Sequence, residues 1–244
     1  MPQQEMDIVG HLDELRKRLI MIIAVFFISF VTAFVFVQDI YNWLTQDLDM
    51  ALAVLGPLDI ILIYFSIAAV AALTVTVPYI IFQIWLFVKP GLTPEEQKAS
   101  ITYIPASLFL FAGGLAFGYF VVLPIVLNFL LTLGAGTFET MFTADRYFQF
   151  VLRMTVPFSV LFEMPLVVMF LTSIGAITPA GMHRNRKYAY FVIVIVSVLV
   201  SPPDFLSDVL VIIPLIFLYE VSISLSKFVY KKRLKRLSME EEAG

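Results

Sequence analysis

The sequence predicts an all-α membrane protein with six transmembrane helices, and three observations support this fold class. The 244 residues are 60% hydrophobic and only 14% charged, which is far too apolar for a soluble domain of this length. A bilayer core of about 30 Å needs roughly 20 helical residues, and long apolar segments recur along the chain. Basic residues gather beside alternate ends of these segments.

We expect residues 1–230 to form a single transmembrane domain and residues 231–244 to form a charged cytoplasmic tail. The first apolar segment is followed by no small-residue cleavage site, so it should remain in the mature protein as a membrane helix. The expected spans are residues 19–37, 60–88, 101–131, 148–174, 188–200 and 205–223.

The basic residues test this topology. Six crossings place both termini on one side of the membrane, and 14 of the 16 Lys and Arg residues then lie on the predicted cytoplasmic side. Arg146 and Arg153 are the two exceptions. Because cytoplasmic loops carry an excess of Lys and Arg, we expect the N and C termini to be cytoplasmic.

The second and third segments are longer than a perpendicular crossing requires. They carry Pro78, and Pro105 and Pro124, respectively, so they should kink, tilt or project beyond the bilayer. Within the third segment, Gly114 and Gly118 form a small-residue face that allows a neighbouring helix to approach closely. Internal packing is the simplest interpretation of that face.

The last two segments are predicted to be short. Residues 188–200 give only about 20 Å of helix. In the sixth segment, Asp208 and Glu220 bracket an apolar stretch of about 16 Å, which Pro214 interrupts. Two adjacent short helices are expected to thin the lipid beside them or to shelter behind longer helices.

Residues 7–19, DIVGHLDELRKRL, lead without a break into the first apolar segment. Their apolar side chains recur at helical spacing on one face, which predicts an amphipathic helix lying at the membrane surface. This stretch places the carboxylate of Glu14 near the first membrane helix. The simplest interpretation of Glu14 is an ordinary surface ion pair with Arg18 at position i+4.

The loop between the second and third segments contains a helix start. Thr93 is the expected N-cap, Pro94 the first helical residue, and Glu96 the residue that completes a capping box. A structural carboxylate that satisfies backbone N–H groups is therefore the simplest role for Glu96. Thr178 and Pro179 repeat the same Thr-Pro helix start.

Glu163 lies well inside the fourth segment, in the sequence Phe-Glu-Met-Pro. An ionisable group at that depth costs roughly 2.5 to 3.5 kcal/mol unless it faces protein or water, so it is a functional candidate. The alternative is a protonated glutamic acid hydrogen-bonded to a neighbouring helix, with Gln83 or Asn128 as the partner. Both interpretations remain open from the sequence.

The sequence suggests no metal and no cofactor. It contains no cysteine, and its two histidines, His11 and His183, lie in different surface segments. This composition removes disulfides, thiolate metal sites and thiol redox chemistry.

Several of these motifs occur together in one known family. The stretches HLDELRKRL (11–19), QIWLFVKPGL (83–92), FGYFVVLP (117–124), FEMP (162–165) and SPPD (201–204), with the six-span pattern, resemble the TatC family. Members of that family are receptor subunits of the twin-arginine protein translocase. The resemblance implies a concave, glove-shaped bundle of six helices in the cytoplasmic membrane of a prokaryote.

The resemblance also implies partners and a non-enzymatic role. The partners are twin-arginine signal peptides of folded cargo, small single-span subunits of the TatA and TatB type, the lipid bilayer and further copies in an assembled complex, with no nucleic acid. It assigns signal-peptide binding to Glu14, Glu96, Phe87 and the run from Arg16 to Arg18. Because the loop before Glu96 departs from the family pattern, Glu95 joins that set.

The remaining family residues lie in the membrane and on the opposite side. Glu163 corresponds to an intramembrane glutamate on the concave face, with Gln83 as a second intramembrane residue. Pro203 and Asp204 correspond to a periplasmic turn. Asp47 stands where members commonly have proline, so the partner contact there is left open.

A second function class is a proton-coupled secondary transporter of small solutes that uses Glu163 as a relay. The chain shows no inverted repeat and no matching pair of broken helices in its two halves, which such transporters often have. Flux of small solutes into liposomes would separate the two classes.

Overall fold

The computed structural model describes residues 2–46, 52–94, 97, 101–134, 142–200 and 205–243. Every named element in this part of the chain is a helix, so the predicted all-α class is confirmed. The chain divides into two compact units. Unit 1 contains residues 1–108 and 141–148, and unit 2 contains residues 109–140 and 149–244.

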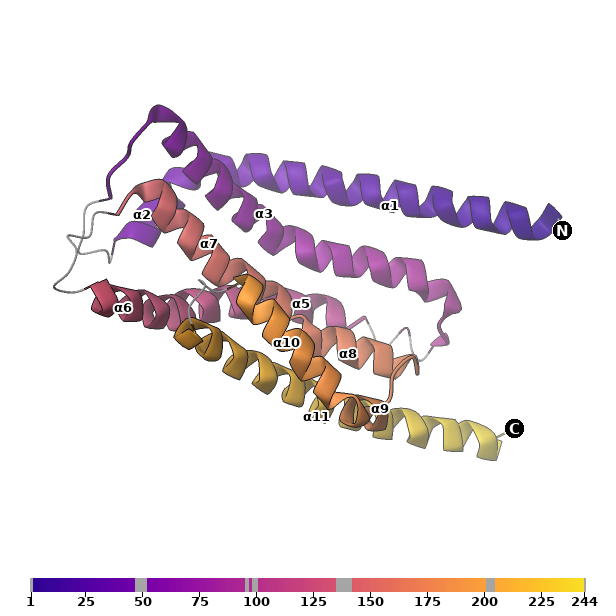
Figure 1. Ribbon diagram of the computed structural model, residues 1–244. Coiled ribbons are helices and arrows are strands. Elements are labelled where there is room, and N and C mark those ends of the chain that lie inside the picture. Colours follow the sequence, from indigo (N-terminus) through magenta and orange to yellow (C-terminus); the bar gives the residue numbers. More distant parts are fainter. Residues whose placement is uncertain are drawn as a thin grey trace. The chain divides into compact units, whose positions relative to one another are not determined.

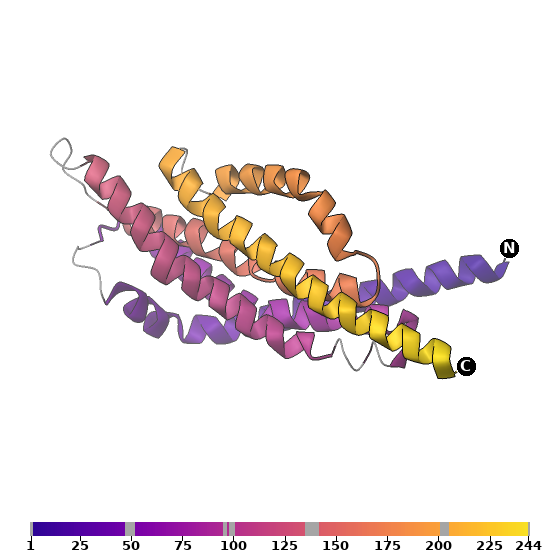
Figure 2. The same ribbon diagram turned by 90° about the horizontal axis from the view of Figure 1, so that it is seen from below.

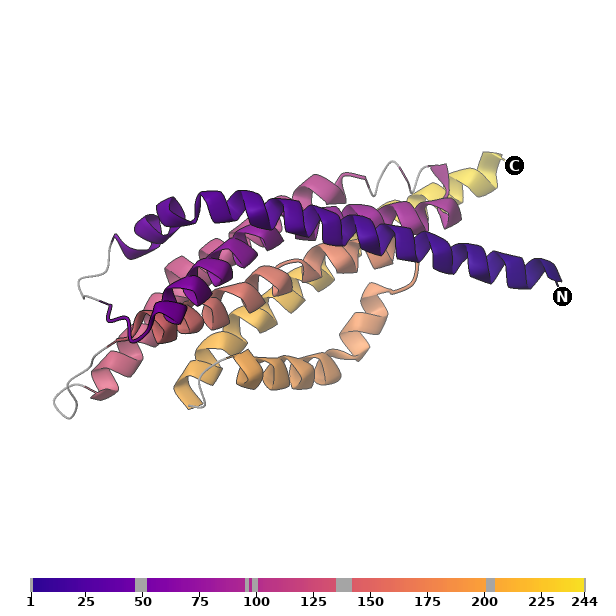
Figure 3. The ribbon, with the colours of Figure 1, turned by 90° about the horizontal axis from the view of Figure 1, so that it is seen from above.

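Two long helices form most of unit 1. Helix α1 (Pro2–Val35) and helix α3 (Pro57–Val88) lie side by side (Figures 1 and 3). The short helix α2 (Val37–Thr45) follows α1, and the 3-10 turn η1 (Lys89–Gly91) ends α3. Because α1 is one uninterrupted helix, the helix predicted over residues 7–19 continues directly into the first apolar segment.

Aromatic and small side chains hold unit 1 together. Phe65 of α3 packs against Phe30 and Phe34 of α1, with ring centroids 5.8 and 5.4 Å apart. Ala68 and Ala72 of α3 are completely buried, which allows close approach of a neighbouring backbone. By contrast, large apolar side chains such as Phe27 remain exposed, as expected of a lipid-facing surface.

Unit 2 contains several shorter helices and one long helix. Its elements are most of α5 (Tyr103–Phe117), the π-helical turn η2 (Gly118–Val122), α6 (Leu123–Gly134), most of α7 (Ala144–Leu161), α8 (Met164–Ser173), α9 (Pro179–Arg184), α10 (Arg186–Val200) and α11 (Phe205–Ala243). Helix α11 packs against α8, α9 and α10 (Figure 2).

The small-residue face of the third segment is a packing surface, as predicted. A Cβ on Gly114 would lie 2.5 Å from the Cα of Ser159, and a Cβ on Gly118 would lie 2.7 Å from the Cα of Thr155. Backbones this close leave no room for a side chain. The ring of Phe117, between the two glycines, contacts Phe158 of α7.

The third segment also deviates from regular helix at its second proline. The N–H of Leu123 donates to the carbonyl of Gly118, five residues earlier, instead of to the usual fourth. Pro124 follows directly and has no N–H to donate, so a single π-helical turn accommodates the missing bond. The predicted irregularity is therefore a π-turn. Helix α3, in contrast, runs through Pro78 as one element.

The last two helices differ from each other. Helix α10 has 15 residues, about 22 Å, and is short as predicted. Helix α11 has 39 residues and continues through the charged residues expected to form a tail, so the prediction of a short sixth helix is wrong. The reason is local, because residues 231–243 are mostly Lys, Arg, Leu and Glu, with no Gly or Pro to stop a helix.

The lengths of the helices decide which of them can cross a bilayer. Five helical stretches in the described part of the chain are long and apolar enough to cross a bilayer, and α10 is below that length. These stretches are Asp13–Val35, Pro57–Gly91, Tyr103–Leu133, Ala144–Ser173 and Ser207–Lys235.

Candidate functional site

The candidate recognition site in unit 1 is a polar network that joins α1 to α3. Arg18 bonds to the Oε1 atom of Glu14 through Nε, at 3.1 Å, and through Nη2. Its Nη1 atom donates to Oε1 of Gln83 on α3, at 3.0 Å, and Nε2 of Gln83 donates to the hydroxyl of Tyr79, at 2.6 Å. The predicted pair of Glu14 with Arg18 is confirmed, and Gln83 extends it.

Burial makes this network stronger than an ordinary surface pair. The side chain of Arg18 is 15% exposed, and Gln83 is 3% exposed. Glu14, in contrast, keeps 37% of its side-chain surface accessible. A partly desolvated guanidinium bonded to an accessible carboxylate holds that carboxylate in one place, and a charge-assisted bond in such a setting exceeds an exposed pair in strength.

The neighbouring charges on α1 form a separate group. Asp13 pairs with Arg16 at 2.7 Å and with Lys17 at 3.0 Å, and both basic side chains are mostly exposed. Successive residues on a helix point in directions about 100° apart, so Asp13 and Glu14 serve different faces. Arg16, a predicted binding residue, therefore belongs to the exposed face, while Arg18 belongs to the buried network.

The loop after α3 is organised by backbone contacts. The side-chain amide of Gln97 donates to the carbonyls of Lys89 and Leu92, both at 3.1 Å, and its backbone N–H donates to the carbonyl of Thr93 at 3.0 Å. This last bond agrees with a helix that starts after Thr93, as predicted. Glu95 and Glu96 lie outside the described residues, so their part in a capping box stays a prediction.

Two aromatic residues lie at the end of α3, directly before this loop. The ammonium group of Lys89 stands 5.3 Å from the centre of the Trp85 ring, a cation–π contact. Phe87, a predicted binding residue, is half-buried on the same last turn.

In unit 2, Glu163 occupies a break in the fourth membrane segment. Helix α7 ends at Leu161, and α8 begins at Met164 with Glu163 as its N-cap residue. The predicted span over residues 148–174 is therefore interrupted at Glu163, although Ala144–Ser173 remains one stretch that is long and apolar enough to cross a bilayer. Pro165 contributes to the break, because it has no N–H to donate to the carbonyl of Leu161.

The carboxylate of Glu163 is buried and has no hydrogen-bond partner among the described residues. The residue is 6% exposed, and both of its carboxylate oxygens lack a hydrogen-bond partner. The alternative of a bond to Gln83 or Asn128 is therefore not supported, and Gln83 is bonded to Arg18 and Tyr79 instead. An unpaired carboxylic acid at a helix break inside a membrane segment is suited to receive a polar group from outside.

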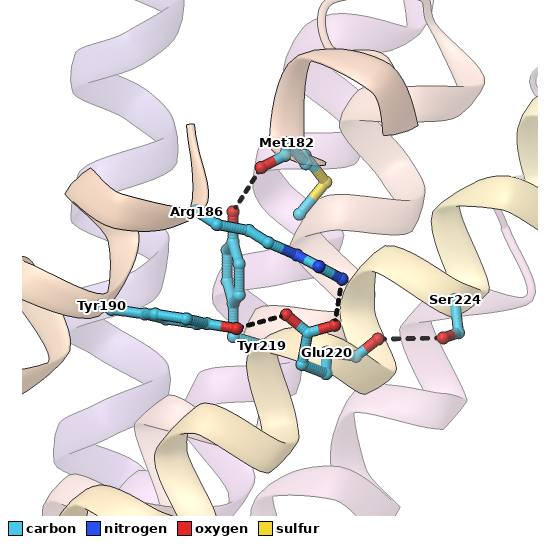
Figure 4. Close-up of polar contacts among 6 residues, drawn as sticks. All are labelled: Met182, Arg186, Tyr190, Tyr219, Glu220 and Ser224. Atoms are coloured by element: carbon cyan, nitrogen blue, oxygen red, sulfur yellow. Dashed lines mark hydrogen bonds and ion pairs between the residues drawn. The ribbon is translucent and has the colours of Figure 1, made fainter. Parts of the chain in front are cut away.

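A second polar cluster in unit 2 was not predicted. Glu220 of α11 accepts a bond from Arg186 at Oε2 and from the Tyr190 hydroxyl at Oε1, the latter at 2.6 Å (Figure 4). The neighbouring Tyr219 donates to the carbonyl of Met182, at 3.0 Å. The sequence indicates only that Arg186 is basic and that Glu220 ends an apolar stretch, because the two lie far apart in the chain.

Thr178 is the N-cap of α9 and accepts a bond from the N–H of Gly181 at 3.1 Å, which confirms the second Thr-Pro helix start. Pro203 and Asp204 lie outside the described residues, so their role in a turn stays a prediction.

Comparison with known proteins identifies the family. The model of the family described as "Sec-independent protein translocase protein (TatC)" matches residues 10–214. The chain belongs to the TatC family. It is 52% identical to TatCd from Bacillus subtilis (strain 168) over 235 residues, which cover 96% of this chain and 97% of that protein. It is 35% identical to TatC from Aquifex aeolicus (strain VF5), with 93% and 98% coverage.

A solved structure agrees with this membership. The chain matches a crystal structure of the twin-arginine translocase receptor TatC with a TM-score of 0.77 and 35% identity, covering 90% of this chain and 99% of that one. As a TatC family member, the chain is a multi-pass protein of the bacterial cytoplasmic (inner) membrane and a component of the Sec-independent protein translocase. These matches give no support to the small-solute transporter.

Proposed function

We propose that this chain is the receptor subunit that binds twin-arginine signal peptides of folded cargo proteins. The observation that carries the proposal is the fixed and accessible carboxylate of Glu14. It is held by Arg18, which is itself held by the buried Gln83. A relative of known structure is called the twin-arginine translocase receptor, which supports the same role here.

The chemistry of the arginine pair suits this site. A guanidinium group is planar and rewards carboxylates that are fixed in position, since it can form two parallel hydrogen bonds. A carboxylate offers about four acceptor positions, so Glu14 has the capacity to accept a peptide arginine in addition to Arg18. We propose Glu96 as the second carboxylate, with Glu95, Phe87 and Arg16 at its side.

The rest of the receptor assignment follows from charge and from the family. We propose that both termini are cytoplasmic, because 14 of the 16 Lys and Arg residues then lie on that side. The chain acts as a scaffold and not as an enzyme. It recruits small single-span subunits of the TatA and TatB type and assembles as several copies in the lipid bilayer.

Glu163 is proposed to serve that recruitment, and Gln83 to serve the peptide site. An unsatisfied, buried carboxylic acid can bond to a polar side chain of an incoming membrane helix. Pro203 and Asp204 are proposed to form a periplasmic turn beside the short helix α10.

The test is peptide capture from detergent-solubilised protein. A twin-arginine peptide should retain the protein at least tenfold better than the same peptide with two lysines, because lysine offers a point charge where arginine offers a planar fork. Equal retention of the protein by the two peptides would contradict the proposal.

A further inference from the structure

Unit 2 contains an apolar groove that the proposed function does not use. It has a volume of about 630 Å³, which lies within the usual range of ligand sites of about 300 to 1,000 Å³. The groove is bounded by α8, α9, α10 and α11, where α9 and α10 arch away from α8 and α11 (Figures 2 and 3). Its lining includes Met164, Met182, Asn185, Tyr188, Ala189 and Tyr219.

The wall of the groove is fixed in shape by the polar cluster of Figure 4. Tyr219, a lining residue, donates to the carbonyl of Met182, which is also a lining residue. Arg186 and Tyr190 at the start of α10 are bonded to Glu220 of α11. These bonds tie α9 and the start of α10 to α11 at one end of the groove.

The charge at this end of the groove is positive. Glu220 is paired with Arg186, so it neutralises that guanidinium. Lys187 remains, and its ammonium group stands 5.1 Å from the centre of the ring of Tyr188, a lining residue that is 62% exposed. Arg184 is exposed and lies in the chain between the lining residues Met182 and Asn185.

From this combination, we propose that the groove binds an acyl chain of an anionic phospholipid whose phosphate is held by Lys187 and Arg184. The apolar groove suits the acyl chain of such a lipid, and the basic side chains beside it suit the phosphate. Tyr188 contributes an amphipathic ring at the border between them, where membrane proteins commonly place tyrosine. A zwitterionic lipid would place its acyl chain in the groove but would bind more weakly, because it has no net negative charge for the two basic groups.

The headgroup part is tested by lipid binding to the purified chain in detergent, followed by native mass spectrometry. Phosphatidylglycerol should bind the parent at least tenfold more tightly than it binds the double variant Arg184→Gln with Lys187→Gln. The matched control is Lys227→Gln, which removes one exposed charge on α11 outside the groove lining and should change binding by less than twofold. Phosphatidylcholine should bind the parent more weakly than phosphatidylglycerol does.

The acyl-chain part is tested by filling the groove. Ala189→Phe adds a ring to the half-buried lining of α10 and should reduce binding of both lipids at least tenfold. The test with the Arg184 and Lys187 double variant does not depend on whether the fold tolerates phenylalanine at position 189. Equal binding of the two lipids by the parent, or unchanged phosphatidylglycerol binding by the double variant, overturns the headgroup site. Unchanged lipid binding by a folded Ala189→Phe variant overturns the groove as the location.

Discussion

The change Glu14→Gln separates a recognition role for this carboxylate from a structural one. Glutamine keeps an Oε1 acceptor at the position where Glu14 receives two bonds from Arg18. Arg18 also keeps its bond to Gln83 on α3, at 3.0 Å. The contact between α1 and α3 should therefore survive the substitution, and only the negative charge is lost.

The expected size follows from the kind of bond that is lost. A hydrogen bond to a charged group contributes about 1.5 to 3 kcal/mol, against about 0.5 to 1.5 kcal/mol for a neutral one. The difference is about 1 to 1.5 kcal/mol, which corresponds to about 5- to 12-fold in the dissociation constant of a twin-arginine peptide. Because the site is partly desolvated, the larger value is the expected one.

Asp13→Asn is the matched control for this experiment. It removes the same charge one residue earlier, from a carboxylate that pairs with the mostly exposed Arg16 and Lys17. Exposed pairs contribute little, so peptide binding should change by about twofold at most. The assay is titration of a labelled peptide against each purified variant, with the melting temperature as the check on folding. Parent-like binding by Glu14→Gln, or an equal loss in Asp13→Asn, would refute a specific site at Glu14.

Three further predictions concern other parts of the chain. Glu96→Gln should weaken twin-arginine peptide binding about tenfold and leave the melting temperature unchanged, because glutamine can still complete a capping box; binding equal to the parent would reduce Glu96 to a helix cap. Glu163→Ala should spare peptide binding but impair export of a twin-arginine cargo in cells, since its carboxylic acid is the proposed contact for a partner helix; full export would leave it a packing role. Gly114→Ala should destabilise unit 2 by about 1 to 3 kcal/mol, because its Cβ would lie 2.5 Å from the Cα of Ser159. A Cβ at Gly113 would have nothing within 4 Å, so Gly113→Ala should leave the melting temperature unchanged or raise it. Equal effects of the two substitutions would contradict the close packing at Gly114.

The sequence predicted the features that depend on short stretches of chain. The small-residue face at Gly114, the pair of Glu14 with Arg18, and the helix start at Thr178 all rest on spacing within a few residues. Helical geometry converts such spacing directly into contact. The apolar segments were found for the same reason, because the length of a bilayer-crossing helix is fixed by the thickness of the hydrocarbon core.

The sequence was least informative where two local rules competed. The hydrophobicity of residues 148–174 predicted one span, and the structure interrupts its helix at Glu163, because Pro165 lacks a backbone N–H. Hydropathy placed the end of the sixth span where the charged residues begin, although those residues are strong helix formers and α11 continues through them. Hydropathy reports where a helix can contact lipid, and propensity reports where the helix ends.

Contacts between distant segments were beyond sequence reasoning, and they show how Glu163 and Glu220 differ. Both carboxylate oxygens of Glu220 are bonded, one by Tyr190 and one by Arg186. Both oxygens of Glu163 are buried without a partner in the part of the chain that the structure describes. The bonds to the half-buried Glu220 join α10 to α11, whereas the buried carboxyl group of Glu163 has its full bonding capacity left for another molecule. The contacts assign Glu220 to the fold, and they support the proposal that Glu163 contacts a partner helix.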